Sequence, residues 1–565
     1  MSPSEKSFSA PVVYGLPLLA AAYAVEYIPL IAYKLAKDGG LFALRDKKAI
    51  TDRVITLAIP QSYILAAAKE NEQSSTPSDE GQLPSLQVQQ RTSTLHLSFW
   101  DYHLAYLEKR TTPSAVAQKV VELLDQHERY NWMRSFDRKA ILNQAEESTQ
   151  RYQQGKPKSQ LDGVFIPVKE EMDVAGLETK GGTGFINDGN PAKKNCHLVQ
   201  RLQDAGAIIV GHTVMDELGW DTFSVNPSTG MPCNPYETNS SCGGSSGGCG
   251  GVVAANLFPI SIGCDGGGSV RIPSAFCGLY GLKTTTGRVS SAATGSIDST
   301  VAVNGPLAAT ADDMTLAYAI MSGPDPNDPQ TTLQPRVSLK DYGLTQTLDG
   351  LTIGIMPRWN NRTHEPAMLH QLDVFAKHFE SLGATLVEID IPDLELAKTA
   401  HLITICAESY NFVSQYPSQH TSFSPYTRLM SAVTRYLNGS DYSRSQQVRS
   451  RIMDQLKHIF EDKKVDLILT PATGMQTPVI PKKAHKYGLS NATWTTTTME
   501  FTTLANFSGI PAVSIPSGFH NGKPLGIQLM AKWYNEALLC RMAKVCESTP
   551  GIERKRPAVW TNPLA

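Results

Sequence analysis

The chain has 565 residues, and its charged fraction of 18% and hydrophobic fraction of 41% are ordinary for a globular protein. The 51 lysines and arginines nearly balance 53 aspartates and glutamates, so no basic excess predicts nucleic-acid binding. Nine cysteines, spread thinly and without zinc-ligand spacing, argue against a disulfide scaffold and favour a reducing compartment. We therefore expect a cytoplasmic protein.

The N-terminal segment is apolar. Residues 7–25 carry no charge, but Glu26 and the prolines at 17 and 29 interrupt the wider stretch. It is marginal for a membrane-spanning helix, which needs about 20 apolar residues, and it lacks the basic region and cleavage site of a signal peptide. We expect a helix that packs on the body of the protein or in a homodimer interface. Peripheral membrane contact and a true span are the alternatives.

The polar stretch 70–92 predicts an exposed loop or disordered insert. We accordingly divide the chain into an N-terminal extension, residues 1–122, and a main domain, residues 123–565. In the main domain, strand-like and helix-like segments alternate. Strands are expected at 163–168, 207–211, 351–356, 384–391, 465–469, 512–515 and 526–530, and helices at 195–206, 368–382 and 536–546. This alternation predicts an α/β fold with a large mixed, mostly parallel β-sheet covered by helices on both faces.

Two segments rich in glycine and serine stand out. Gly243–Gly248 has the composition of a flexible linker, but it lies inside the alternating pattern and precedes an apolar stretch that must pack. The second segment, Asp265–Ser269, follows a predicted strand at 259–264 and places three glycines before a serine. Glycines let the backbone turn tightly, so that N–H groups can converge beside the serine hydroxyl as an oxyanion hole requires.

These segments, together with Lys169 at the end of a predicted strand, resemble the amidase signature family. The likeness rests on CGGSSGG (Cys242–Gly248), DGGGSVRIPSAFCGLYGLKTTTGRVS (Asp265–Ser290) and GVFIPVKEEMDVAG (Gly163–Gly176). It extends to FTTLANFSGIPAVSIPSGFHNGKPLGIQLM (Phe501–Met530) and covers the chain from about Leu123 onward. The resemblance implies that residues 123–565 form the catalytic domain of an amidase signature enzyme.

The resemblance also implies a role for each matching residue. Ser269 matches the nucleophile, Ser245 the bridging serine after a cis peptide bond from Gly244, and Lys169 the base. The oxyanion hole would be formed by the backbone N–H groups of Gly266, Gly267, Gly268 and Ser269. Asp265 and Arg271 match positions that brace the loop. No metal or organic cofactor is expected.

A lysine can act as a base only when it is neutral, so we expect Lys169 to be buried with a lowered pKa. Nearby carboxylates would oppose this, and we therefore expect Glu170, Glu171 and Asp173 to point outward or to pair elsewhere. A proton would then pass from Ser269 through Ser245 to Lys169 and return to the leaving nitrogen.

The implied reaction is hydrolysis of a small-molecule amide C–N bond through an acyl-enzyme on Ser269, with side activity on esters or carbamates. Short aliphatic amides, aryl amides, fatty acid amides and carbamates such as urethane all stay open, although the apolar N-terminus favours a lipophilic substrate. A G-x-S-x-G esterase using Ser245 is one alternative, but its context fails because 226–242 is polar and not strand-like. An amidotransferase-type amidase subunit acting in a complex and a non-catalytic protein of the same fold are the others.

Overall fold

The computed structural model describes residues 12–45, 47, 58–73, 84–87, 95–294 and 297–565. An eleven-stranded sheet forms its centre, with the spatial order β2 (Met133–Phe136), β4 (Ile208–Thr213), β3 (Phe165–Lys169), β5 (Ile260–Asp265), β7 (Val303–Ala308), β6 (Tyr280–Lys283), β12 (Ala512–His520), β13 (Lys523–Ala531), β10 (Leu467–Pro471), β8 (Thr352–Ile355) and β9 (Thr385–Glu388). A separate pair joins β1 (Val13–Tyr14) to β11 (Leu489–Ser490). The eight predicted strands are confirmed as β3, β4, β5, β8, β9, β10, β12 and β13.

The mixed sheet is confirmed, but the expected parallel majority is wrong. Among the described strands of this sheet, four neighbouring pairs are parallel and six are antiparallel. Parallel pairing is confined to β4–β3–β5 and to β10–β8–β9. One cause is local: Asn521 and Gly522, both at positive φ, form the two-residue turn that folds β12 and β13 into a hairpin.

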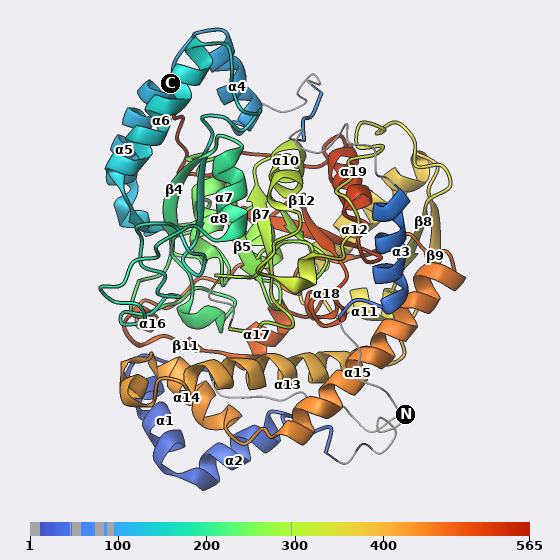
Figure 1. Cartoon of the computed structure of the whole chain (residues 1–565). Helices are drawn as coiled ribbons and strands as arrows, with labels where there is room; N and C mark the ends of the chain where they lie inside the picture. The colour runs from blue at the N-terminus through green and yellow to red at the C-terminus, as the bar shows by residue number, and fades with distance from the viewer. Residues whose placement is uncertain (1–11, 46, 48–57, 74–83, 88–94, 295–296) are drawn as a thin grey trace.

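Helices surround the sheet (Figure 1). The three predicted helices are confirmed as α7 (His197–Asp204), α12 (Pro366–Ser381) and α19 (Glu536–Cys546). The other α-helices are α1 (Leu16–Tyr27), α2 (Pro29–Asp38), α3 (Gln61–Gln73), α4 (Phe99–Leu107), α5 (Pro113–His127), α6 (Arg138–Gln153), α8 (Gly247–Ala254), α9 (Arg271–Phe276), α10 (Ala311–Met321), α11 (Pro357–Asn360), α13 (Leu394–Val413), α14 (Pro425–Thr434), α15 (Gly439–Lys457), α16 (Ala484–Tyr487), α17 (Ala492–Thr498) and α18 (Thr503–Ser508).

Successive residues of a strand point their side chains to opposite faces of the sheet, so the strands contribute to two hydrophobic cores, one on each face. In β10, Leu467 and Leu469 belong to the core that includes side chains of α10, α12 and α19. Ile468, between them, belongs to the core that includes side chains of α13, α15 and α18. The expectation of helices on both faces is therefore confirmed.

The N-terminal extension packs on this body. The apolar stretch forms α1, which bends into α2, and both helices contact α14. Among the described residues no single helix is both long and apolar enough to cross a membrane, although α1 and α2, bent by 105°, pass that test as a pair.

The predicted polar insert, residues 70–92, falls partly outside the described residues, namely at 74–83 and 88–92. Its described part agrees in part with an exposed loop, because residues 84–87 have no regular secondary structure and Ser85 and Gln87 are exposed. Residues 70–73 end α3, and the buried Leu86 exchanges two hydrogen bonds with the Gln160 amide, at 2.8 and 2.7 Å. Leu86, an apolar residue within this polar stretch, therefore packs in the hydrophobic core.

Candidate active site

Three elements bring the predicted site together. The strands β3 and β5 are parallel neighbours, so their carboxyl ends, Lys169 and Asp265, lie at the same edge of the sheet. Ser245 lies in the turn that leads into α8. Lys169 Nζ donates hydrogen bonds to Ser245 Oγ, at 2.8 Å, and to the Cys264 carbonyl oxygen, at 3.4 Å. Lys169 and Ser245, predicted from separate motifs, are therefore in direct contact.

Ser269 lies beside this pair. The Ser246 N–H donates to the Ser269 carbonyl oxygen at 3.4 Å, and the Gly244–Ser245 peptide bond is cis, as the resemblance implies. Lys169, Ser245 and Ser269 are only 2%, 1% and 8% exposed. In the described structure the two serine hydroxyls are not hydrogen-bonded to each other. Such contacts commonly tighten only when substrate binds.

Close packing explains the glycines around Ser245. A Cβ on Gly248 would lie 2.4 Å from the Trp132 carbonyl oxygen and 2.6 Å from the Val214 nitrogen. A Cβ on Gly244 would lie within 3.0 Å of three backbone atoms of residues 221–223. The segment is therefore a tightly packed turn and helix start, and not a flexible linker.

The expectation for the neighbouring carboxylates is correct for two and wrong for the third. Glu170 pairs with Arg134 at 3.1 Å, and Asp173 accepts a hydrogen bond from Thr179 at 2.6 Å. Glu171 instead points inward, and its Oε1 lies 2.9 Å from Lys169 Nζ. Glu171 lies in the turn that follows β3, where the Met172 N–H donates to the Lys169 carbonyl oxygen at 3.1 Å, and this turn brings its carboxylate back to Lys169.

The protonation of Lys169 is correspondingly different from our expectation. Burial alone would lower the pKa of Lys169, but the Glu171 carboxylate outweighs burial, and the pKa of Lys169 is raised. The predicted lowering of this pKa is wrong. The raised pKa favours the ammonium form of Lys169, whose Nζ lies 2.9 Å from Glu171 Oε1.

A second carboxylate, which no motif predicted, lies against the glycine loop. A Cβ built on Gly266 would lie 1.9 Å from Asp298 Oδ2, so the carboxylate covers the Gly266 Cα. Burial, followed by the charges of Glu171 and Glu408, raises the pKa of Asp298 to about 7. This side chain is therefore neutral below pH 7 and charged above it.

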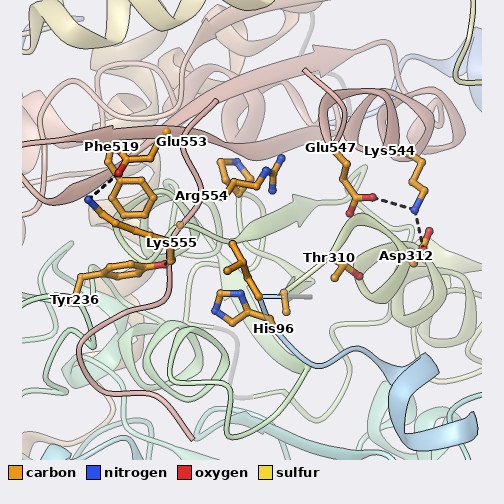
Figure 2. A pocket seen from close by; sticks show the side chains of 15 residues that line it. His96, Tyr236, Thr310, Asp312, Phe519, Lys544, Glu547, Glu553, Arg554 and Lys555 are labelled. Atoms are coloured by element: carbon orange, nitrogen blue, oxygen red, sulfur yellow. Dashed lines mark hydrogen bonds and ion pairs between the residues drawn. The ribbon is translucent and has the colours of Figure 1, made fainter. Parts of the chain in front are cut away.

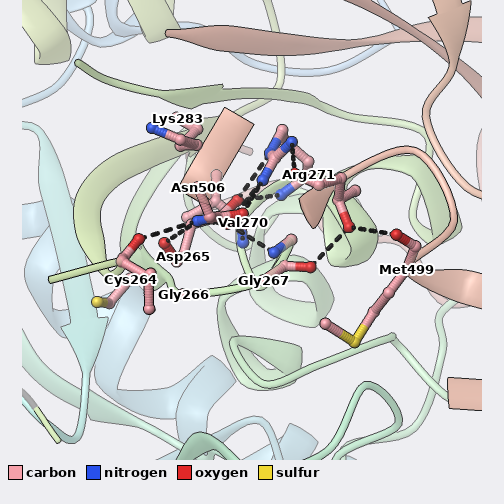
Figure 3. A network of polar contacts seen from close by, with 12 residues as sticks. Cys264, Asp265, Gly266, Gly267, Val270, Arg271, Lys283, Met499 and Asn506 are labelled. Atoms are coloured by element: carbon pink, nitrogen blue, oxygen red, sulfur yellow. Dashed lines mark hydrogen bonds and ion pairs between the residues drawn. The ribbon is translucent and has the colours of Figure 1, made fainter. Parts of the chain in front are cut away.

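A buried ion pair braces the loop from behind (Figure 3). The Arg271 guanidinium donates to both oxygens of Asp265, at 3.0 and 2.9 Å, and both residues are fully buried. Arg271 also donates to Gln528 Oε1 at 2.7 Å and to Asn506 Oδ1 at 2.6 Å. Burial would raise the pKa of Asp265, but Arg271 and Asn506 hold it well below its usual range. The structure thus brings together the two residues matched to bracing positions.

The hydrogen bonds of Asp265 exclude one of the predicted oxyanion donors. The Gly268 N–H, one of the predicted donors, is engaged by Asp265 Oδ1 at 2.6 Å. No hydrogen bond in the described structure uses the N–H groups of Gly266, Gly267 or Ser269. The loop is held further by His401 Nε2 at the Gly266 carbonyl, 2.8 Å, and by Thr502 Oγ1 at the Gly267 carbonyl, 2.6 Å.

Apolar side chains border the site. Leu218 and Ile297 belong to a buried cluster with Ile186, Val413 and Phe423. Ile297 precedes Asp298, which covers Gly266, and it lines a cavity of about 450 Å³ together with Phe412. On the other side, a Cβ on Gly267 would meet the Met499 methyl at 2.5 Å. Ile297 and Met499 thus place apolar side chains beside the glycine loop, whereas the cavity itself is lined mainly by polar residues, among them Ser299, Glu408 and Asn411.

Another cavity, of about 60 Å³, shares no lining residue with the predicted site. Figure 2 shows that charged side chains line it and that several of these pair with one another. Lys544 binds Asp312 and Glu547, each at 2.9 Å, and Lys555 binds Glu553 at 3.2 Å. These ion pairs leave the cavity without an obvious reactive group.

The chain is similar to known amidases along most of its length. Residues 115–540 match the sequence model of the Amidase family. A fatty acid amide hydrolase of Arabidopsis thaliana is 36% identical over 475 residues, which are 81% of this chain and 77% of that protein. The 1-carboxybiuret hydrolase subunit AtzE of Pseudomonas sp. (strain ADP) is 33% identical over 405 residues, 70% of this chain and 85% of that protein.

A solved structure agrees with these sequence matches. It belongs to work on a vestigial protein complex and the origins of an s-triazine catabolic enzyme. It superposes with a TM-score of 0.75 at 28% identity and covers 81% of this chain and 99% of its own. The chain belongs to the amidase signature family and is a hydrolase of amide C–N bonds.

Proposed function

We propose that this enzyme hydrolyses amides of long-chain carboxylic acids, with Ser269 as the nucleophile. The observation that carries the proposal is the buried 2.8 Å contact between Lys169 Nζ and Ser245 Oγ, next to a glycine loop that ends in Ser269. A serine hydroxyl attacks an amide only when a base removes its proton, and this contact supplies a path to one.

The steps follow from that arrangement. Ser269 Oγ attacks the amide carbonyl carbon while its proton passes to Ser245, and the Ser245 proton passes to Lys169. The free N–H groups of Gly266, Gly267 and Ser269 stabilise the negative oxygen of the tetrahedral intermediate. The proton returns through Ser245 to the leaving nitrogen, and the C–N bond breaks. Water then releases the carboxylic acid from the acyl-enzyme on Ser269.

Two observations favour a long acyl chain. The buried apolar cluster that includes Leu218 and Ile297 lies beside the site, since Ile297 precedes Asp298, whose carboxylate covers Gly266. The relative from Arabidopsis thaliana, 36% identical, is a fatty acid amide hydrolase. Each buried methylene contributes about 0.8 kcal/mol, so a chain that enters an apolar space gains binding energy with length.

Exposed apolar side chains support peripheral membrane contact. We define the α1–α2 corner as Tyr27, Ile28, Leu30 and Ile31, of which Tyr27 and Leu30 are 73% and 76% exposed. Lys34 and Lys37, also exposed, follow on α2 and would attract anionic lipid headgroups. On its inner side α1 is fastened through Glu26, which pairs with Arg428 at 2.5 Å on α14. We propose that this corner inserts into the lipid surface from which a lipophilic substrate comes.

A chain-length series tests the substrate class. We expect kcat/KM to rise at least about 100-fold from an acetyl to a dodecanoyl amide of the same amine, and Ser269→Ala to abolish turnover of both. Equal values across the series would exclude the long-chain assignment. Residual activity above a few per cent in Ser269→Ala would exclude the nucleophile.

Vesicle cosedimentation tests the membrane contact. The wild-type chain should sediment with vesicles of anionic phospholipid, and Leu30→Asp/Ile31→Asp should stay in the supernatant with unchanged turnover of a soluble short-chain amide. A matched surface change on the far side, Leu142→Asp, serves as control. Absence of vesicle binding together with a dimer that the double substitution dissociates would instead assign the corner to a homodimer interface.

A further inference from the structure

We propose that Glu171 is a positioning residue that takes up the Lys169 proton, so that four side chains form the relay: Ser269, Ser245, Lys169 and Glu171. The inference rests on the proposed function of Ser269 and adds a member that no motif assigned. It also answers a question raised by the structure, namely how a lysine paired with a carboxylate becomes a base.

The geometry around Lys169 carries the inference. Three oxygens surround Nζ: Ser245 Oγ at 2.8 Å, Glu171 Oε1 at 2.9 Å and the Cys264 carbonyl at 3.4 Å. The Glu171 side chain is 8% exposed, and Lys169 Nζ, at 2.9 Å, is the charged partner of its Oε1. This carboxylate oxygen therefore has Lys169 as its partner, and a buried charge is tolerated only when it is paired.

The other titratable groups near Lys169 do not compete for this role. Burial raises the pKa of the Cys264 thiol on β5 and of the Cys249 thiol on α8, so both are neutral. Burial and Asp221 raise the pKa of Asp216 well above its usual value, so that carboxyl is neutral too. Asp298 ionises only near pH 7 and lies over Gly266.

The proton balance then closes within the site. When Lys169 is an ammonium beside the Glu171 carboxylate, its nitrogen has no lone pair and cannot accept a proton. An N–H bond of the ammonium breaks, and its proton forms an O–H bond on Glu171, which leaves a neutral amine beside a neutral acid. The amine accepts the Ser245 proton as Ser245 accepts that of Ser269. When the leaving nitrogen takes a proton from Ser245, Lys169 returns one to Ser245 and recovers its own from Glu171.

Burial lowers the free-energy cost of the proton transfer from Lys169 to Glu171. In water an ammonium and a carboxylate stay charged, but the desolvation of two charges in the interior brings the neutral pair closer in free energy. A Gln at position 171 keeps the size of the side chain but cannot accept a proton. In that variant only the molecules whose Lys169 has lost its proton to solvent are active, so activity follows the ionisation of the lysine itself.

The test is the pH profile of kcat/KM for an amide, in Glu171→Gln and in a matched control. Glu170→Gln is the control, because Glu170 is an adjacent buried carboxylate that pairs with Arg134 and does not face Lys169. In Glu171→Gln we expect the acidic limb to move by at least about one pH unit to the alkaline side, because the limb then follows the ionisation of the Lys169 amine and no longer that of a carboxyl group, and amines ordinarily ionise at much higher pH than carboxyls. Activity should fall at least about tenfold at pH 6 and recover to within a few-fold of wild type at pH 9. Glu170→Gln should keep the wild-type limb.

A loss of equal size at every pH in Glu171→Gln would overturn the inference, since a merely structural role gives that result. If Glu171→Gln does not fold, Glu171→Asp decides: the carboxylate is retained but withdrawn, so the limb should stay while kcat falls at least about tenfold at unchanged KM. An unchanged kcat in Glu171→Asp would overturn the inference. Labelling of Ser269 by a fluorophosphonate distinguishes failure of this inference from failure of the proposed function. If Ser269 is labelled but the acidic limb of Glu171→Gln does not move, the role of Glu171 is refuted and the nucleophile is not.

Discussion

Replacement of Arg271 by methionine is the most informative perturbation of the loop's support. The change keeps the apolar stem of the side chain and removes a guanidinium that reaches Asp265, Gln528 and Asn506 with contacts of 2.6 to 3.0 Å. Arg271 is 0% exposed, so no water can take over these contacts without opening the core. The Asp265 carboxylate would be left buried, with most of its compensating charge removed.

The magnitude follows from this burial. Removal of one partner of a buried ion pair costs about 3–5 kcal/mol of unfolding free energy, whereas removal of both often costs far less. We therefore expect Arg271→Met to lose about 3–5 kcal/mol and Asp265→Asn/Arg271→Met to recover about 1–3 kcal/mol relative to the sum of the single changes.

The pH dependence has a definite sign. Arg271 and Asn506 hold the pKa of Asp265 well below its unfolded value despite burial. In wild type this group therefore contributes stability that is present above the unfolded pKa and lost as pH falls into the acid range. In Arg271→Met burial dominates and the pKa of Asp265 rises, so the contribution of this group should instead decrease as pH rises.

Urea unfolding at pH 5 and pH 8, followed by tryptophan fluorescence, measures these free energies for wild type, both single variants and the double variant. Strictly additive single effects, or a loss below about 1 kcal/mol in Arg271→Met, would refute the reasoning, because either result means that Asp265 does not depend on Arg271.

Three further predictions concern catalysis. Lys169→Ala should reduce amide hydrolysis at least about tenfold more than hydrolysis of the matched ester, because an amide nitrogen must be protonated to leave; equal losses on the pair would argue against the proton relay. Gly266→Ala should abolish turnover, since its Cβ would meet Asp298 Oδ2 at 1.9 Å. Gly267→Ala should retain measurable activity, because its Cβ comes too close only to the movable methyl of Met499 and meets His401 at the ordinary contact distance of 3.4 Å. The reverse order of kcat would contradict the placement of the loop. Asp298→Asn should match wild type below pH 6 and exceed it above pH 8, because the carboxyl, with a pKa of about 7, becomes negative beside the oxyanion loop only as pH rises through that value; superimposable rate profiles would count against this.

The strands and helices that the sequence predicts are those with local signals. Short continuous apolar runs mark β3 and β10, and apolar residues at helical spacing mark α7. The parallel majority failed because pairing direction depends on connections, and the one local signal for a hairpin, Asn521-Gly522, had no part in the expectation.

The same distinction holds for the site. Lys169, Ser245 and Ser269 lie in motifs, so the resemblance identified them. The position of Glu171 was predicted wrongly, because it depends on the turn after β3, which is closed by the Met172 N–H at the Lys169 carbonyl, and no motif describes that turn. His401 lies 135 residues from the Gly266 carbonyl that it contacts, and no short-range pattern predicts such a pairing.

The claim that Ser269 is an activated nucleophile is tested most directly by intact mass after treatment with a fluorophosphonate, followed by peptide mapping. We predict one adduct, on Ser269, in the wild-type chain and none in Lys169→Ala. An adduct on Ser245, or no adduct on a folded wild-type chain, would contradict the assignment.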